Sequence, residues 1–148
     1  MSIERKVEEA ILSKDMIVSI GNDKYRIKRP TIATLIAVSA EISELPTMEI
    51  RENKQMIDIV RNAKHYDKIG MIFAIMIRGY RNDEGWLKSI LNRSRNKKLA
   101  KRILNSYTPR ELAVALASVF SKMEVKDFFV LTTSLSEVNV IKRTVEVD

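Results

Sequence analysis

The chain has 148 residues, a length typical of one domain, and 45% of them are hydrophobic, which is enough to build a core. It contains no cysteine, which excludes disulfides, thiolate catalysis and cysteine-based zinc sites and favours a reducing cytosol. Only four Gly and three Pro are present, which favours long regular elements over a loop-rich β-sandwich. The N-terminus lacks the apolar core of a signal peptide, and no apolar run approaches the roughly 20 residues that cross a bilayer. We therefore expect a cytoplasmic protein that has no membrane partner.

The first third of the chain predicts a helix, a hairpin and a second helix. A short amphipathic helix is expected over 3–13, with Ile3, Val7, Ala10 and Ile11 on one side. Two β-prone runs, MIVSI and YRIKR, flank GNDK and predict a β-hairpin at about 15–29, the one clear β element. Pro30 and Thr31 then begin a helix that ends near Leu45, before Pro46. Its apolar residues at helical spacing are Ile32, Leu35, Ile36, Ile42 and Leu45.

The middle of the chain predicts a core helix between two more polar ones. A helix over about 54–65 is expected to turn Met56, Ile57, Val60 and Ala63 inward. The run IGMIFAIMI is apolar around its whole circumference, so a helix over 68–80 with Asp67 as its N-cap is predicted to form the centre of the core. Gly79 and the following RNDEG end that helix. Two short helices, beginning at Trp86 and near Leu99, are expected on either side of a basic joint over 92–98.

The last third opens with the strongest local signal. Thr108, Pro109 and Glu111 form a capping box with proline at the first helical position. The helix that follows carries one apolar stripe: Leu112, Leu116, Val119, Phe120 and Met123. Asp127 is expected to cap a last helix, whose stripe is Phe128, Leu131, Thr132, Leu135 and Val138. Residues 139–148 alternate apolar and polar side chains, which is compatible with an extended tail.

The fold class predicted from these patterns is mainly α. We expect a single domain over 1–148 with about six to seven helices and one small N-terminal hairpin. The helical body spans about 31–138, and the tail spans 139–148.

No pattern of residues predicts catalysis, a metal site or a cofactor. His65 is the only histidine and has no partner His or Cys, so we interpret it as a solvent-facing residue at a helix end. Glu41 and Glu44 share a helix face, but no third ligand stands at a fixed offset from them. No nucleotide-binding, hydrolase or metalloprotease motif occurs. We therefore expect that the protein is not an enzyme.

The formal net charge is +7, and much of the excess lies in one basic cluster: Arg93, Arg95, Lys97, Lys98, Lys101 and Arg102. Such a cluster can neutralise phosphates, which keeps a nucleic-acid-binding module open as an alternative. No aromatic residue is interleaved with it, so bases have no stacking platform there. A solvated helix face or contact with an acidic protein is the favoured interpretation.

The order of segments resembles a known family. A hairpin leading into GNDKYRIKRPTIATL, several helices, and DFFVLTTSLSEVNVIKRTVEV are together similar to the tail assembly chaperones of long-tailed bacteriophages, over about residues 15–147. The resemblance implies a non-enzymatic assembly factor in the host bacterial cytoplasm. Such proteins bind the tape measure protein, keep its apolar helices soluble and recruit tail tube protein. The family supplies no motif-matched functional residues. A structural tail or capsid subunit stays open as an alternative, as does a homo-oligomer.

The C-terminal segment contains the candidate partner-binding residues. Phe128 continues the stripe of the last helix and is expected in the core. Phe129 points about 100° away from it, so it is either an exposed aromatic anchor or covered by the tail. The candidate contacts are Phe129, Leu135, Val140 and Ile141.

Overall fold

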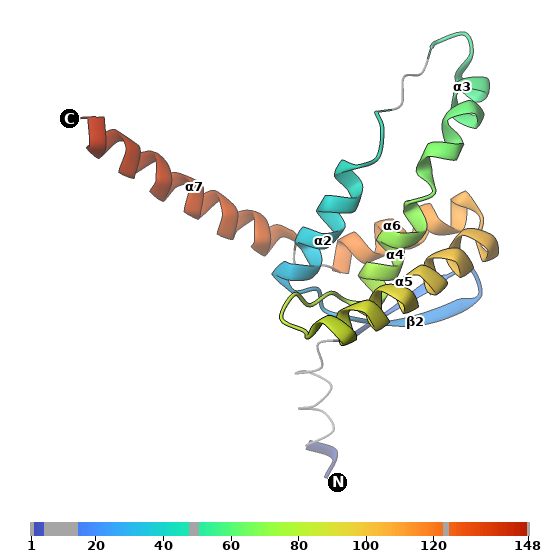
Figure 1. The fold of residues 1–148 in the computed structure, drawn as a ribbon, viewed down its shortest axis with the longest axis horizontal. Coiled ribbons are helices and arrows are strands. Elements are labelled where there is room, and N and C mark those ends of the chain that lie inside the picture. Colours follow the sequence, from blue (N-terminus) through green and yellow to red (C-terminus); the bar gives the residue numbers. More distant parts are fainter. Residues whose placement is uncertain (1, 5–14, 48–50, 123–124, 148) are drawn as a thin grey trace.

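The computed structural model describes residues 2–4, 15–47, 51–122 and 125–147, without the side chains of residues 125, 140 and 144–147. Most of the helix expected over 3–13 lies outside these residues, as do the side chains of Met123 and Val140. The described part is mainly α with one small N-terminal hairpin, so the predicted fold class is confirmed (Figure 1). No helix within the described ranges is long and apolar enough to cross a membrane.

The predicted hairpin is formed by β1 (Asp15–Ile20) and β2 (Asp23–Lys28), which pair in antiparallel register with Asp15 opposite Lys28. Gly21 occupies the turn with φ 57°, a conformation that glycine adopts without strain. Alternation along the strands buries Val18, Ile20 and Ile27 on one face. That face packs against the helices, and β1 lies against α6 (Pro109–Lys122).

The apolar run forms the central helix α4 (Ile69–Arg78), as predicted, and nearly all its residues are buried. It packs along α5 (Trp86–Ser106) and also contacts α2 (Ile32–Ser43) and β2. Gly79 ends it with φ 74°, also as predicted. The predicted N-cap was wrong: Asp67 has helical backbone angles because the 3-10 helix η1 (Ala63–Tyr66) runs almost directly into α4, and an N-cap needs an extended backbone.

A single helix, α5, replaces the two short helices predicted on either side of a basic joint. Arg and Lys are good helix formers, so the basic segment continues the helix while its side chains face solvent. The stretch without apolar residues at helical spacing therefore marks an exposed side of one continuous helix, and not a break between two helices. At the inner side of the same segment, Asn96 is buried and accepts a hydrogen bond from Arg78 at 2.9 Å.

The helices α2 and α3 (Gln55–Asn62) expose residues that their periodicity placed inside. Thr31 caps α2 by accepting a hydrogen bond from the Thr34 backbone N–H at 3.3 Å. The side chains that α2 buries are Thr34 and Val38, whereas Ile32, Ile36 and Ile42 are exposed.

In α3 the predicted inward face is wrong. Met56, Ile57, Val60 and Ala63 are all exposed. The reason is that α3 packs mainly against η1 and projects from the body in Figure 1, so its apolar side is not covered by the part of the chain that the structure describes.

The capping box at the start of α6 forms as predicted. The Glu111 carboxylate accepts from the Thr108 backbone N–H at 2.9 Å, and the Thr108 hydroxyl accepts from the Glu111 N–H at 3.3 Å. In the predicted apolar stripe of α6, Val119 is buried and Leu112 and Leu116 are half-buried, whereas Phe120 is exposed. Ala115 is buried beside them.

The last helix, α7 (Val125–Val147), continues through the segment predicted to be extended, so that prediction was wrong. An extended tail with no neighbouring strand would leave its backbone hydrogen bonds to water, whereas a helix satisfies them within itself. Figure 1 shows α7 extending away from the body. Phe128, which was expected in the core, is half-buried, whereas the rest of its stripe is exposed: Leu131, Thr132, Leu135 and Val138.

Candidate functional site

The exposed apolar side chains of α7 form the surface that is least explained by the fold. This α7 surface consists of Phe129, Val130, Leu131, Leu135, Val138 and Ile141. The three predicted contact residues with described side chains are well exposed: Phe129 at 66%, Leu135 at 62% and Ile141 at 64%. Of the two alternatives left open for Phe129, the structure shows the exposed one. Val140, the fourth, has a side chain outside the described residues.

The helical positions divide this surface into two sides. At about 100° per residue, Leu131, Leu135 and Val138 lie within about 60° of one another. Ile141 lies about 60° from Val138 but about 120° from Leu135, and Phe129 points about 160° away from Leu131. The helix therefore does not bring Phe129, Leu135 and Ile141 onto one side. A partner helix lying along Leu131, Leu135 and Val138 would leave Phe129 outside the contact.

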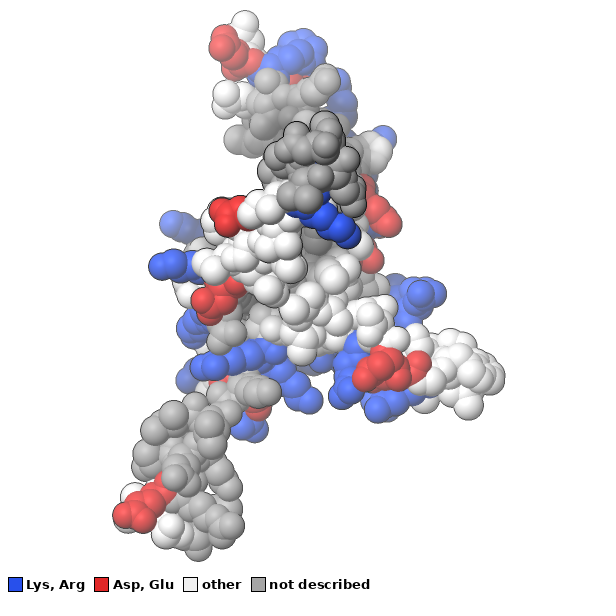
Figure 2. Space-filling view, turned by 90° about the vertical axis from the view of Figure 1, so that its left-hand side faces the viewer, with Lys and Arg blue, Asp and Glu red and all other residues white. Residues whose placement is uncertain are grey.

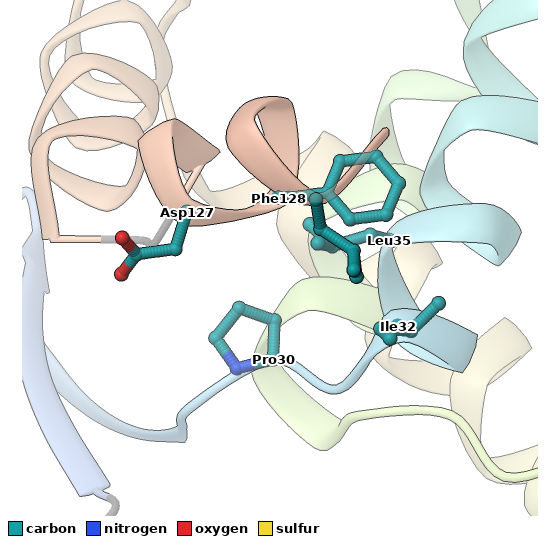
Figure 3. Close-up of a pocket in the computed structure, with 6 residues that line it drawn as sticks. Pro30, Ile32, Leu35, Asp127 and Phe128 are labelled. Atoms are coloured by element: carbon teal, nitrogen blue, oxygen red, sulfur yellow. The ribbon is translucent and has the colours of Figure 1, made fainter. Parts of the chain in front are cut away.

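The first turn of α7 contacts the body at a pocket of about 180 Å³, lined by Pro30, Ile32, Leu35, Asp127, Phe128 and Leu131. Figure 3 shows Phe128 of α7 close to Leu35 and Ile32 of α2. This apolar contact explains why Phe128 is half-buried while the rest of the stripe is exposed. The base of α7 is therefore attached to α2, and the remainder of the helix stands in solvent.

The hydroxyl groups of α7 are used within the helix. Thr133 and Ser134 donate to the carbonyl oxygens of Phe129 and Val130, one turn earlier, at 2.7 and 2.8 Å. Thr132 and Ser136 make similar bonds to residues three and four positions earlier. Because these donors are occupied, the middle of α7 offers a partner mainly apolar contacts.

A second group of exposed apolar side chains lies on α3, where Met56, Ile57, Ile59 and Val60 face solvent. The segment before α3 is held by a clasp between Arg51 and Asp58. The Arg51 guanidinium donates to both oxygens of Asp58, at 2.7 and 3.1 Å, and the Arg51 backbone N–H donates at 3.2 Å. These hydrogen bonds lower the pKa of Asp58, whose side chain is almost fully buried. The clasp orients α3 locally and leaves its apolar side open.

The basic cluster does not form one patch. Arg93 and Lys97 are one turn apart and line a groove between α2, α4 and α5. By helical position, Arg95, Lys98 and Arg102 lie on another side of α5, while Lys101 continues the Arg93 side. Sequence reasoning grouped the six residues but missed Lys28 and Arg78, which line the same groove from β2 and α4. These two residues lie far from the basic cluster in the sequence, so no sequence pattern linked them to it.

The remaining polar groups have structural explanations. Tyr107 donates to the Asp23 carboxylate at 2.6 Å and its hydroxyl lies 2.5 Å from that of Tyr25, which fastens the hairpin to the end of α5. Burial, and then the bonds to Asp23 and Tyr25, raise the pKa of Tyr107. His65 is exposed in η1, as expected. Within the described ranges, no three acidic or histidine side chains gather where they would hold a metal ion.

Comparison of the chain with protein-family models, with curated proteins and with solved structures found no match. The resemblance to tail assembly chaperones therefore rests on the sequence segments that carry it.

Proposed function

We propose that this protein is a non-enzymatic binding factor for helical proteins and that the α7 surface is its main contact. The observation that carries the proposal is a 23-residue helix on which five apolar side chains are each more than half exposed: Phe129, Val130, Leu135, Val138 and Ile141. Helical stability in proteins comes mostly from packing of an apolar face, so an isolated helix of this kind gains stability when a partner covers it. Each fully buried Leu, Val or Phe side chain contributes about 1.5–3 kcal/mol.

The partner class follows from the resemblance. A tape measure protein is a long helical chain with apolar stripes, and two such helices associate by packing these stripes together. The protein would keep the tape measure soluble in the host cytoplasm and recruit tail tube protein to it. The exposed side chains of α3 offer a second apolar contact, which suits a factor that holds two proteins at once.

The alternatives have weaker support. A nucleic-acid-binding module would use the basic cluster as one surface, but α5 directs its cations to different sides. A structural tail subunit would have the same exposed helix and would differ in staying in the finished particle. Analysis of purified phage particles distinguishes a chaperone from a structural subunit, because a chaperone is absent from the finished particle and a structural subunit is present in it.

Co-expression tests the proposal. The tape measure protein of the same genome is produced with this chain or with an empty vector, and its soluble fraction is measured. We expect the chain to raise that fraction several-fold and to co-purify with the partner. Equal solubility in both cultures would show that the chain is not a chaperone for this partner.

A further inference from the structure

A groove of about 810 Å³ lies between α2, α4 and α5, on a part of the molecule separate from α7. Its apolar lining comes from Ala37 and Ala40 of α2 and from Met71 and Ile75 of α4. The volume corresponds to about two turns of an α-helix, which is ~10 Å across and ~5.4 Å long per turn. The groove is large enough for a short peptide segment and falls within the range of binding sites, about 300–1,000 Å³.

The charges around this groove are strongly unbalanced. Its basic lining residues are Lys28, Arg29, Arg78, Arg81, Lys88, Arg93 and Lys97, and its acidic ones are Glu41 and Glu84. Figure 2 shows Lys and Arg side chains in a band across one face of the molecule. Two cations are neutralised locally, since Arg81 pairs with Asp83 at 2.7 Å and Lys88 lies 3.7 Å from Glu84. In the described part of the chain, Lys28, Arg93 and Lys97 form no ion pair.

One cation is fixed at the groove wall. Arg78 donates to the Asn96 side-chain oxygen at 2.9 Å and to the backbone and side-chain oxygens of Asn92 at 3.2 and 3.3 Å. All three acceptors are neutral, so its charge is held in place without being cancelled. Burial, and then the charge of Arg95, lower the pKa of Arg78, while the charge of Glu84 acts in the opposite direction. A carboxylate arriving there would be stabilised.

We propose that the groove binds an acidic amphipathic segment of a protein, with apolar side chains against Met71 and Ile75 and carboxylates toward Arg78, Arg93 and Lys97. The proposal rests on the protein-binding function but concerns a different surface from α7. A protein segment fits better than nucleic acid because the lining is partly apolar and, among the described residues, Tyr80 is its one aromatic side chain. Electrostatic complementarity of this kind sets orientation and speeds association.

The test measures binding of labelled peptides to the full chain by fluorescence anisotropy. The probe is a helical peptide with Leu on one side and Glu on the other, and its comparison replaces every Glu by Gln. A single-stranded DNA of similar charge is the third probe. We expect the Glu peptide to bind at least about tenfold more tightly than the Gln peptide, which corresponds to ~1.4 kcal/mol.

Two matched double variants locate the site on α5. Arg93→Glu with Lys97→Glu reverses charges that line the groove, and Lys98→Glu with Arg102→Glu makes the same change in net charge on another side of the helix. The groove variant should weaken binding of the Glu peptide at least about tenfold, and the control variant less than about threefold. Arg93→Gln with Lys97→Gln provides the same comparison if charge reversal perturbs the helical circular dichroism.

Three results would overturn the proposal: equal losses in both variants, equal binding of the Glu and Gln peptides, or tighter binding of the DNA than of the Glu peptide. Leu135→Asp on α7 separates this surface from the proposed chaperone contact, because it should leave binding of the Glu peptide unchanged. Peptide binding that survives in a chain unable to solubilise the tape measure protein would support the groove and count against the proposed function alone.

Discussion

Gly70 occupies a point of close approach between α4 and the backbone of α5. A Cβ at this residue would lie 2.5 Å from the Ala100 carbonyl oxygen and 2.8 Å from Leu104 Cγ. The first of these atoms belongs to the α5 backbone, so the clash cannot be relieved by turning a side chain. The α4–α5 interface, which is the most extensive between helices of this chain, therefore depends on glycine.

Gly70→Ala should destabilise the protein by about 1–3 kcal/mol because the two helices must move apart. Urea unfolding monitored by circular dichroism measures the change. Gly85→Ser is the matched control: a Cβ at Gly85 meets no atom within 4 Å, and Ser is favoured at an N-cap. A Gly70→Ala protein as stable as the wild type would show that α4 and α5 do not pack as described.

Phe129→Ala should leave the free energy of unfolding within about 0.5 kcal/mol of the wild type, because the side chain is 66% exposed. It should weaken capture of a helical partner if the aromatic ring acts as an anchor. Phe128→Ala is the comparison, since Phe128 lines the pocket against α2 and its loss should loosen the base of α7. If the wild type and Phe129→Ala capture equal amounts of partner, Phe129 is not part of the contact, and the Leu135 side of α7 remains as the candidate.

Residues whose roles depend on near neighbours in the chain were the most predictable. The capping box of Thr108 and Glu111 and the helix end at Gly79 are fixed within a few residues, and both were predicted. The prediction that Asp67 is an N-cap was wrong because η1 runs into α4, which gives Asp67 a helical backbone conformation. The groove cations Lys28 and Arg78 were missed because only the packing of β2, α4 and α5 brings them toward Arg93.

At the level of the element, α3 depends on the clasp between Arg51 and Asp58. Hydrogen bonds from Arg51 lower the pKa of Asp58 below its ordinary value of 3.8. Because the folded pKa is depressed, the clasp contributes stability above about pH 3.8, and that contribution is lost as pH falls through the folded pKa. We expect α3 to be the first element destabilised at low pH, because this helix packs mainly against η1.

The titration of Asp58, followed by NMR, should therefore have its midpoint below that of an ordinary aspartate. Hydrogen-exchange protection in α3 should decrease over the same pH interval. Arg51→Gln is the control, because it removes the charged donor and should return the midpoint toward 3.8. A wild-type Asp58 that titrates at the ordinary value would mean that the clasp is absent in solution.

Element type was predicted more accurately than element extent. The hairpin, α4 and α6 were expected where they are found, because alternation, an all-round apolar run and a capping box are each specific. Two errors share one cause. The polar stretch in α5 and the alternating stretch at the end of α7 were interpreted as interruptions, but both segments continue as helix, with the α5 cations and Ile141 exposed.

At the scale of the whole molecule, a packed body is combined with two projecting helices (Figure 1). Hydrophobic periodicity predicted which sides of α3 and α7 are apolar. The same periodicity is produced by a helix face that packs within its own chain and by one that binds another protein, so it does not distinguish the two cases. Met56 and Ile57 were predicted to face inward for that reason, and both are exposed.

The central claim is that the aligned apolar side of α7 holds a partner. Leu135→Asp and Thr133→Asp test it most directly, because they add the same charge about 160° apart on one exposed helix. Each variant is co-expressed with the tape measure protein, and the amount of partner that co-purifies is measured against the wild type. We expect Leu135→Asp to lose most of the partner and Thr133→Asp to retain it. Equal retention in both variants, with unchanged folding, would show that this side of α7 does not hold the partner.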